Sequence, residues 1–393
     1  MDIKSLPLNE LTEYIVDKGF PAFRAKQLYT WLHKKLIRDA EEMTNIPKDM
    51  RKMLSEDIVT LTLAKKLESA IDGTKKYVFM LSDGNVIESV FMSYKHGYSV
   101  CISSQAGCRM GCRFCASTLL GLSRNLTVSE MLDQIYYIER DTGMRISNVV
   151  VMGTGEPLDN YDNLCTFIKM LSDENGLNIS QRNITVSSCG LVPEIRRLAD
   201  EHFTITFALS LHAATDEKRR ELMPIAKRYS LSEVLDACMY YFNETGRRIT
   251  FEYSLVAGEN DSVSDAKELI KLLKNYPCHV NLIPVNPIKE RQYKRSDKNS
   301  VRRFKELLET NGINATVRRS MGKDIDAACG QLRKAHIDSS KGGTKDSTKG
   351  GSSDGSKDDS LDSSSDGSKD DSLDSSSDRL KHSTKDGSKD SLK

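Results

Sequence analysis

Cys108-Arg-Met-Gly-Cys112-Arg-Phe-Cys115 is the stretch around which the rest of this chain is organised. Three thiolates on so short a segment can converge on one soft metal centre. A [4Fe–4S] cluster has four irons, so three protein ligands leave one iron open to a small molecule, which points to catalysis. A structural zinc normally takes four protein ligands in two pairs, and no second close pair is present. The three cysteines would also share one face of a helix as core residues, but Gly107, Gly111 and the charged Arg109 and Arg113 disfavour a buried helix.

The composition places limits on the class of protein. The chain has 393 residues, nine cysteines and a formal charge of +1. An odd number of cysteines suits a reducing compartment better than a disulfide scaffold. The N-terminus lacks an apolar signal core, and no run of about eighteen apolar residues occurs. We therefore expect a cytoplasmic protein that does not enter a membrane.

The last part of the chain differs in character from the rest. From Asp338 onward it holds ten Lys and Arg against thirteen Asp and Glu, with no aromatic residue and no cysteine. The block Asp354–Ser365 is repeated unchanged at Asp366–Ser377. So little apolar surface cannot offset the entropy cost of ordering the chain. We therefore predict a disordered tail over 337–393. Without this acidic tail the rest of the chain is mildly basic, a charge that neither demands nor excludes binding to nucleic acid.

Helical spacing dominates the N-terminal end, and a period of two follows it. The pattern predicts a helical accessory domain at 1–60, a β-hairpin connector at 61–93 with a turn at Ser82–Asn85, and a core at 94–336. In the core, strand and helix patterns alternate from Tyr98 to Arg318. Repeated βα units predict an α/β fold with a parallel sheet, closed fully or partly into a barrel, whose chemistry lies at the C-terminal ends of the strands.

Further motifs fall at those strand ends. Gly153-Thr-Gly-Glu-Pro157 follows a strand, and glycine there lets the backbone approach a ligand while Glu156 accepts from an ammonium group. Ser187, Ser210, His212 and Asn286 end later strands, where hydroxyl, imidazole and amide groups suit a ribose, carboxylate or adenine. Each of these is weak alone, and His212 is equally compatible with a core position.

Two further cysteines are candidates for covalent chemistry. Cys101 ends a strand seven residues before the cysteine motif. Cys329 lies between Gly322 and Gly330 in a small, polar stretch that predicts a loop near the surface, where a thiol is a better nucleophile than in a core. Spacing alone favours a structural role for each of these two cysteines. Cys165, Cys189, Cys238 and Cys278 are predicted to be structural.

The cysteine spacing resembles that of the radical S-adenosylmethionine (SAM) enzymes, in which the open iron binds SAM. Together with Gly155-Glu-Pro157, Ser210-Leu-His212 and Asp324-Ile-Asp-Ala-Ala-Cys329-Gly-Gln-Leu332, residues 1 to about 334 closely resemble the family that methylates C2 of adenosine in 23S rRNA and tRNA. Thr154 and Ser188 depart from the residues common in that family. The resemblance implies a partial (βα)6 radical SAM barrel.

The resemblance also implies the cofactors and the role of each site residue. It implies a [4Fe–4S] cluster on Cys108, Cys112 and Cys115, and two SAM per turnover. It assigns SAM binding to the strand-end residues Gly155, Glu156, Ser187, Ser210, Leu211, His212 and Asn286. Cys329 would receive a methyl group, and a radical formed from the second SAM would activate it for addition to C2. Glu88 would take the C2 proton, and Cys101 would attack the sulfur of Cys329 to release the RNA, leaving a transient disulfide.

The implied partners are 23S rRNA and tRNA, and an electron donor such as flavodoxin or ferredoxin, acting on a monomer. The basic loop Lys289–Arg295, with Arg302, Arg303, Arg318 and Arg319, is suited to RNA phosphates or is simply a solvated surface. Three alternatives stay open: a sister enzyme that methylates C8 of the same adenosine, a metal-bearing RNA-binding module without activity, and a radical SAM enzyme acting on a small metabolite.

Overall fold

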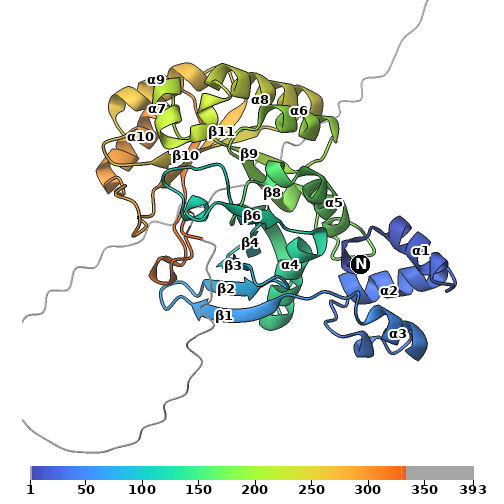
Figure 1. The fold of residues 1–393 in the computed structure, drawn as a ribbon. Helices are drawn as coiled ribbons and strands as arrows, with labels where there is room; N and C mark the ends of the chain where they lie inside the picture. Colours follow the sequence, from blue (N-terminus) through green and yellow to red (C-terminus); the bar gives the residue numbers. More distant parts are fainter. Residues whose placement is uncertain (1, 329, 333–393) are drawn as a thin grey trace, which may run out of the picture. The chain divides into compact units, whose positions relative to one another are not determined.

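The structure, a computed structural model, describes residues 2–328 and 330–332, all of which belong to one structural unit (Figure 1). The repeat tail and Cys329 lie outside the described residues. The helices are α1 (Leu8–Asp17), α2 (Phe23–His33), α3 (Lys48–Leu54), α4 (Val128–Thr142), α5 (Tyr161–Leu171), α6 (Val192–Asp200), α7 (Asp216–Leu222), α8 (Leu231–Thr245), α9 (Val263–Leu273) and α10 (Lys298–Thr310). The strands are β1 (Thr62–Glu68), β2 (Lys75–Met80), β3 (Val86–Tyr94), β4 (Gly97–Ile102), β5 (Gln105–Gly107), β6 (Leu122–Asn125), β7 (Ile146–Val151), β8 (Ile184–Ser188), β9 (Thr206–Ser210), β10 (Ile249–Leu255), β11 (Cys278–Pro284) and β12 (Ala315–Val317).

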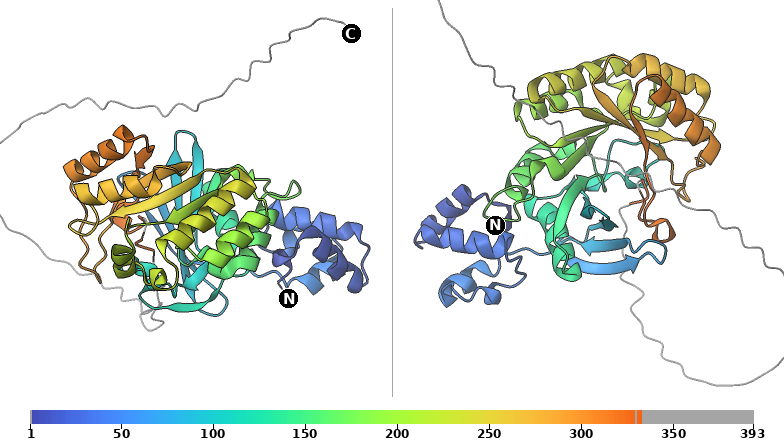
Figure 2. Two further views of the ribbon diagram at one scale, coloured as in Figure 1. Left: turned by 90° about the horizontal axis from the view of Figure 1, so that it is seen from above. Right: turned by 180° about the vertical axis from the view of Figure 1, so that it is seen from behind.

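One sheet organises the fold, with its strands in the order β1-β2-β3-β4-β7-β8-β9-β10-β11-β12. Strands β1 to β4 are antiparallel, and every pairing from β4 to β12 is parallel. Helices α6, α8, α9 and α10 lie along the outer side of the parallel strands (Figures 1 and 2). Six strands of this sheet, β4, β7, β8, β9, β10 and β11, are each followed along the chain by a helix, which for β4 comes after the separate pair β5–β6. This arrangement confirms the predicted partial (βα)6 barrel. No helix in the described part of the chain combines the length and apolarity needed to cross a membrane.

Local sequence explains where the long helices begin and end. The Thr127 side chain accepts from the N–H of Glu130, and the Glu130 side chain accepts from the N–H of Thr127 at the start of α4. This is the capping box that the sequence predicts. Helix α8 begins in the same way with Ser230 and Glu233, and it ends at Gly246 in the left-handed conformation (φ 64°).

Four elements were not predicted from the sequence: strand β1, helix α7 and the two short strands β5 and β6. No residue of β1 is buried, so it carries no apolar alternation. Helix α7, Asp216-Glu-Lys-Arg-Arg-Glu-Leu222, is charged in six of its seven positions, yet it buries Arg219 completely. Apolar periodicity signals only elements whose buried face is apolar, and none of these has such a face.

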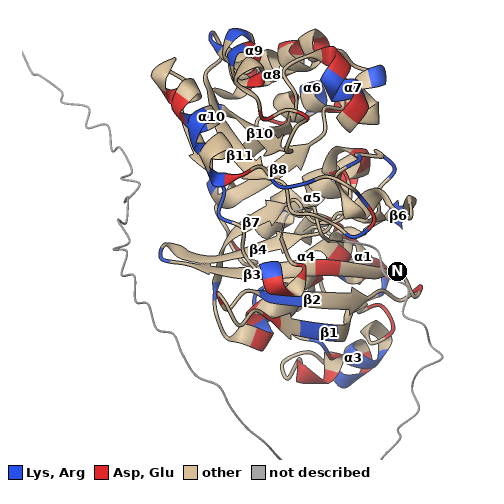
Figure 3. Cartoon of the chain, turned by 90° about the vertical axis from the view of Figure 1, so that its left-hand side faces the viewer, with Lys and Arg blue, Asp and Glu red and all other residues tan. Residues whose placement is uncertain are grey.

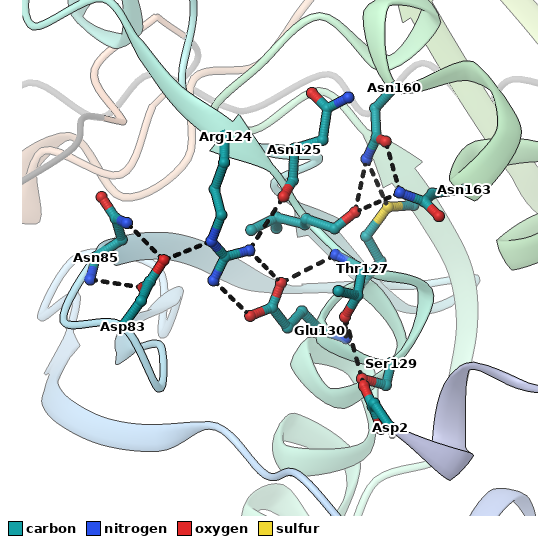
Figure 4. A network of polar contacts seen from close by, with 12 residues as sticks. Asp2, Asp83, Asn85, Arg124, Asn125, Thr127, Ser129, Glu130, Asn160 and Asn163 are labelled. Carbon is teal, nitrogen blue, oxygen red and sulfur yellow. Dashed lines mark hydrogen bonds and ion pairs between the residues drawn. The ribbon is translucent and has the colours of Figure 1, made fainter.

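The N-terminal segment is fastened to helix α4. The ammonium group of Lys4 lies 2.6 Å from the carboxylate of Asp133, and the Lys4 side chain is only 1% exposed. Asp2 and Ser129 form a second contact beside it, and Arg124 joins Glu130 of α4 to Asp83 in the β2–β3 turn (Figure 4). Loss of either partner would leave the other charge buried without compensation, which is strongly destabilising. The Lys4–Asp133 pair therefore holds the N-terminal segment against α4.

His33 gives the fold a predictable pH dependence. The ring is completely buried, its Nδ1 lies 2.8 Å from the hydroxyl of Tyr136, and burial lowers its pKa to about 3 from 6.5. The folded state therefore excludes a proton that the unfolded chain binds below pH 6.5. We expect the free energy of unfolding to fall by up to about 1.4 kcal/mol per pH unit from about pH 6 toward pH 3 on account of this group. Urea unfolding at a series of pH values measures this dependence, and the free energy of unfolding should change less steeply with pH in His33→Gln than in the parent chain.

Candidate active site

The three cysteines lie in an irregular loop between β5 and the 3₁₀ helix η3 (Ala116–Thr118). Residues 108–115 form no helix, so the alternative of core cysteines on a helix face is wrong. Gly107 has a φ of 85°, and a Cβ there would lie 1.9 Å from the carbonyl oxygen of Gly121. Glycine is therefore required at the point where the chain turns into the loop.

The cysteine loop is fixed by hydrogen bonds to distant parts of the chain. The N–H of Arg113 donates to the carbonyl of Leu222 at the end of α7 (2.9 Å). The N–H of Ala116 donates to the carbonyl of Gly330 (2.9 Å), and the hydroxyl of Ser117 donates to the carbonyl of Leu332 (2.8 Å). Residues on the C-terminal side of position 329 are thus attached directly to the loop.

One cavity, called the main cavity below, unites most of the residues singled out from the sequence. It encloses about 1000 Å³ of space outside protein atoms, its open mouth included. The predicted site residues that line it are Cys108, Cys112, Cys115, Gly155, Glu156, Ser187, Ser210, His212 and Asn286. Leu211 does not line it, since its side chain packs in the hydrophobic core.

The donor set of the main cavity fits an iron–sulfur cluster. Burial raises the pKa of the Cys108 thiol to about 12 and that of Cys112 further, so thiolates there need cations beside them. Within residues 2–328 and 330–332, no three His, Cys, Asp or Glu side chains converge on a single metal ion. Each ligand of a cluster binds a different iron, and the thiols of Cys108, Cys112 and Cys115 line one cavity that could hold such a cluster.

The carboxylate of Glu156 is oriented before any ligand binds. One oxygen accepts from the N–H of Leu158 (3.1 Å) and the other from the N–H of Cys189 (2.8 Å). The side chain is buried, and burial raises its pKa. A carboxylate held in this way, at the wall of a cavity, suits the ammonium group of a ligand. Cys189, predicted to be only structural, lines the main cavity as well.

The glycines of the Gly153–Pro157 segment have a packing role that the sequence did not reveal. A Cβ on Gly153 would lie 2.7 Å from the carbonyl carbon of Ile102, and one on Gly155 would lie 2.7 Å from Cβ of Gln105. Both glycines line the main cavity, but the close approach that requires them is to the chain between β4 and β5. The sequence predicted that these glycines let the backbone approach a ligand, and the structure adds this packing role.

Polar side chains at three strand ends complete the main cavity. The hydroxyls of Ser187 and Ser210, at the ends of β8 and β9, lie 3.3 Å apart. His212 Nδ1 accepts from the N–H of Ser254 (3.0 Å), and burial lowers the pKa of the ring to about 3. The ring is therefore neutral, and its proton is on Nε2, which makes Nε2 a hydrogen-bond donor. Asn286 Oδ1 accepts from Arg295.

A second, smaller cavity, the side cavity, adjoins the main one and contains Cys101. Its walls include Val90, Met92, Cys101, Met152, Ile283, Asn286, Arg318, Met321, Ala327, Ala328 and Leu332. Asn286, Arg318 and Leu332 line both cavities. Ala327, Ala328, Gln331 and Leu332 are buried, so the prediction of a surface loop around position 329 holds only for the exposed residues 323, 324 and 326.

Glu88 lies in β3 and lines neither cavity. Its carboxylate pairs with Lys76 at 2.8 Å, and both side chains are less than 10% exposed. Val90, two residues farther along β3, pairs with Cys101 of β4. Because side chains two residues apart on a strand share a face, Glu88 is on the face of the sheet that carries Cys101.

Two charged residues of the main cavity were missed or misplaced by the sequence reasoning. Glu252, in the middle of the apolar strand β10, lines the main cavity, and its carboxylate accepts from the amide of Asn281 (3.1 Å). Arg318 was predicted to be a surface residue for RNA phosphates, yet it lines both cavities. A lone acidic residue inside a buried strand is a signal that would have found Glu252.

Comparisons with known proteins show which family this chain resembles. Residues 102–273 match the model of the radical SAM superfamily, and residues 1–60 match the N-terminal domain of ribosomal RNA large subunit methyltransferases. A protein of Lachnoclostridium phytofermentans, named as a probable dual-specificity RNA methyltransferase RlmN, is 61% identical over 86% of this chain and 96% of its own. A relative of the same name from Lachnospira eligens is 60% identical over 87% of this chain and 99% of its own.

A solved structure extends the agreement to three dimensions. A radical SAM methyltransferase from Sphaerobacter thermophilus superposes with a TM-score of 0.82 at 43% identity, over 84% of this chain and 99% of its own. The superfamily uses a [4Fe–4S] cluster and SAM, which the donor set of the main cavity fits. This chain therefore belongs to the RlmN family of dual-specificity RNA methyltransferases, within the radical SAM superfamily.

Proposed function

We propose that this enzyme methylates C2 of adenosine in 23S rRNA and tRNA, and that Cys329 carries the methyl carbon to the base. One observation supports this assignment above others. Gly330 and Leu332, which follow the cysteine, are hydrogen-bonded to Ala116 and Ser117, directly after the last cysteine of the loop. A nucleophile in this segment would work beside the cofactors and not at a distant surface.

The residues that line the main cavity support the cofactor roles that we propose for them. Cys108, Cys112 and Cys115 hold the cluster, and Glu156 binds the amino group of SAM. Ser187, Ser210, His212 and Asn286 bind its other polar groups, and Gly155 shapes the site. Leu211, which packs in the core, holds its neighbours Ser210 and His212 in place. When bound, SAM and the cluster supply a methyl group and a carbon radical. The neutral His212 donates from Nε2 without bringing a positive charge near the sulfonium of SAM.

Three side chains of the protein carry the remaining steps. Cys329 receives the methyl group as a thioether and becomes linked through that carbon to C2. Glu88 accepts the proton that leaves C2. The thiolate of Cys101 then attacks the sulfur of Cys329. The carbon–sulfur bond breaks with its electron pair on carbon, which takes up a proton to become the methyl group, and the methylated RNA leaves. A disulfide between the two cysteines remains, and an external reductant must reopen it. Cys101 lines the side cavity together with Ala327 and Ala328, which precede Cys329.

The target base must leave its stack in the RNA before it can enter a site as enclosed as the main cavity. Lys289, Arg291 and Lys294 are exposed in the loop between β11 and α10, close in sequence to Asn286, and are suited to phosphate contacts. Basic and acidic segments are otherwise interspersed on α7, α9 and α10 (Figure 3). An electron donor such as flavodoxin or ferredoxin completes the set of partners, and we propose that the enzyme acts as a monomer in the cytoplasm.

The position of the new methyl group tests the proposed function. Protein reconstituted without oxygen and supplied with SAM and RNA should yield 2-methyladenosine, identified by mass spectrometry of the nucleosides against synthetic standards. Glu88→Gln should lower the rate by about 10²–10⁴-fold, the usual contribution of a positioned base. Glu68→Gln, on the exposed strand β1, is the matched control and should leave the rate unchanged. A product methylated at C8 would contradict the assignment in favour of the sister enzyme.

A further inference from the structure

Lys76 and Glu88 form a buried ion pair in the antiparallel part of the sheet. Nζ of Lys76 lies 2.8 Å from Oε1 of Glu88, with exposures of 7% and 5% for the two side chains. Lys76 pairs with Val90 and Val78 pairs with Glu88, so the two charges are diagonal neighbours on one face. Stability alone does not explain such a pair, since two apolar residues of similar size usually serve a fold as well or better.

Lys76 also contacts the segment that leads to Cys329. Its ammonium group donates to the backbone carbonyl of Asp326 at 3.1 Å, three residues before the cysteine. Asp326 has a φ of 50°, in the left-handed region that aspartate adopts only at a cost. The hydrogen bond from Lys76 to the carbonyl of Asp326 therefore helps to stabilise this unfavourable backbone conformation.

The turn between β1 and β2 holds the same segment from the other side. Ser69 donates from its hydroxyl to the carboxylate of Asp324 (2.7 Å), and the N–H of Ala70 donates to the same carboxylate (3.0 Å). The N–H of Gly322 donates to the carboxylate of Asp72 (3.0 Å). These bonds and the Lys76 contact come from one stretch, residues 69–76, so this stretch determines where residues 322–326 lie.

We infer that Lys76 is a positioning residue, which fixes the carboxylate of Glu88 relative to the segment carrying Cys329. The inference rests on the proposed function, in which Glu88 takes the C2 proton from a base linked to Cys329. A charge-assisted hydrogen bond fixes the Glu88 side chain, and the bond to Asp326 ties the same ammonium group to the cysteine segment. Lys76 makes and breaks no bond to substrate. Proton transfer requires the carboxylate oxygen within about 3 Å of its target, so a small displacement would slow that step.

The test compares Lys76→Met with Lys76→Arg in the full-length enzyme, reconstituted with cluster and SAM. The amounts of released methylated RNA and of RNA still attached to protein are measured in a single turnover by denaturing gel and mass spectrometry. We expect Lys76→Met to lower the ratio of released to attached RNA by at least roughly tenfold. This effect is smaller than the rate enhancement of about 10²–10⁴-fold that a positioned base contributes, because the base itself is still present. Lys76→Arg, which keeps the charge and the donors, should recover most of that ratio.

A double variant separates positioning from a general weakening of the fold. If Lys76 acts through Glu88, Lys76→Met should cause no further loss in a Glu88→Gln background. An unchanged ratio in Lys76→Met, or an equal slowing of attachment and release, would overturn the inference. If Lys76→Met does not fold, Lys76→Gln replaces it, since its amide can still donate to Asp326. Failure of the proposed function is distinguishable, because the parent enzyme itself would then form neither attached RNA nor 2-methyladenosine.

Discussion

Replacing Cys112 by alanine is expected to abolish methylation, with a loss of more than about a thousandfold. Cys112 is buried beside Cys108 and Cys115 at the wall of the main cavity. Loss of a residue that only hydrogen-bonds to a metal ligand typically lowers metal affinity or activity by about 10–100-fold. Loss of one of the three ligands themselves should lower activity far more. The measurement is the iron and sulfide content of protein purified without oxygen, together with 5′-deoxyadenosine formation and RNA methylation.

Cys238→Ala provides a matched control for this loss. Cys238 is completely buried on α8 and packs in the hydrophobic core. Its replacement should cost about 1 kcal/mol of stability and leave the cluster and activity in place. Retention of a full cluster and of methylation in Cys112→Ala would show that the loop does not hold the cluster. Zinc in place of iron in the parent protein would favour a metal-bearing RNA-binding module instead.

Replacing Cys101 by alanine is expected to trap the RNA on the enzyme. In the proposed sequence only the thiol of Cys101 breaks the bond between Cys329 and the methyl carbon, so each enzyme molecule should react once and stop. Multiple-turnover activity should fall at least about a hundredfold, while protein-linked RNA approaches one equivalent. Mass spectrometry of nuclease-treated protein should find the residual nucleotide on Cys329.

Two further variants sharpen this result. Cys329→Ala should form neither linked RNA nor methylated product, whereas Cys165→Ala, a buried cysteine of α5, should behave as the parent enzyme. Sustained turnover by Cys101→Ala would contradict the covalent route. Full turnover by Cys329→Ala would show that the methyl carbon does not pass through Cys329.

Local patterns in the sequence were sufficient for most of the fold. The capping box at Thr127 and Glu130 and the alternation of strand and helix patterns after Tyr98 located the elements of the barrel, because caps and burial periodicity act over a few residues. Strand β1 and helix α7 were missed for the same reason, since a half-exposed edge strand and a charged helix carry little apolar signal.

The sequence by itself determined the chemistry available to this protein: three cysteines in one short loop, a Gly-Glu-Pro segment after a strand, and hydroxyl, imidazole and amide groups at later strand ends. Only the tertiary structure decided how these groups meet. It placed Glu252 and Arg318 in the main cavity, buried the residues on both sides of position 329, and joined Glu88 through Lys76 to Asp326. Those contacts span up to about 250 residues of chain, and sheet register and packing set them, which no short-range pattern encodes.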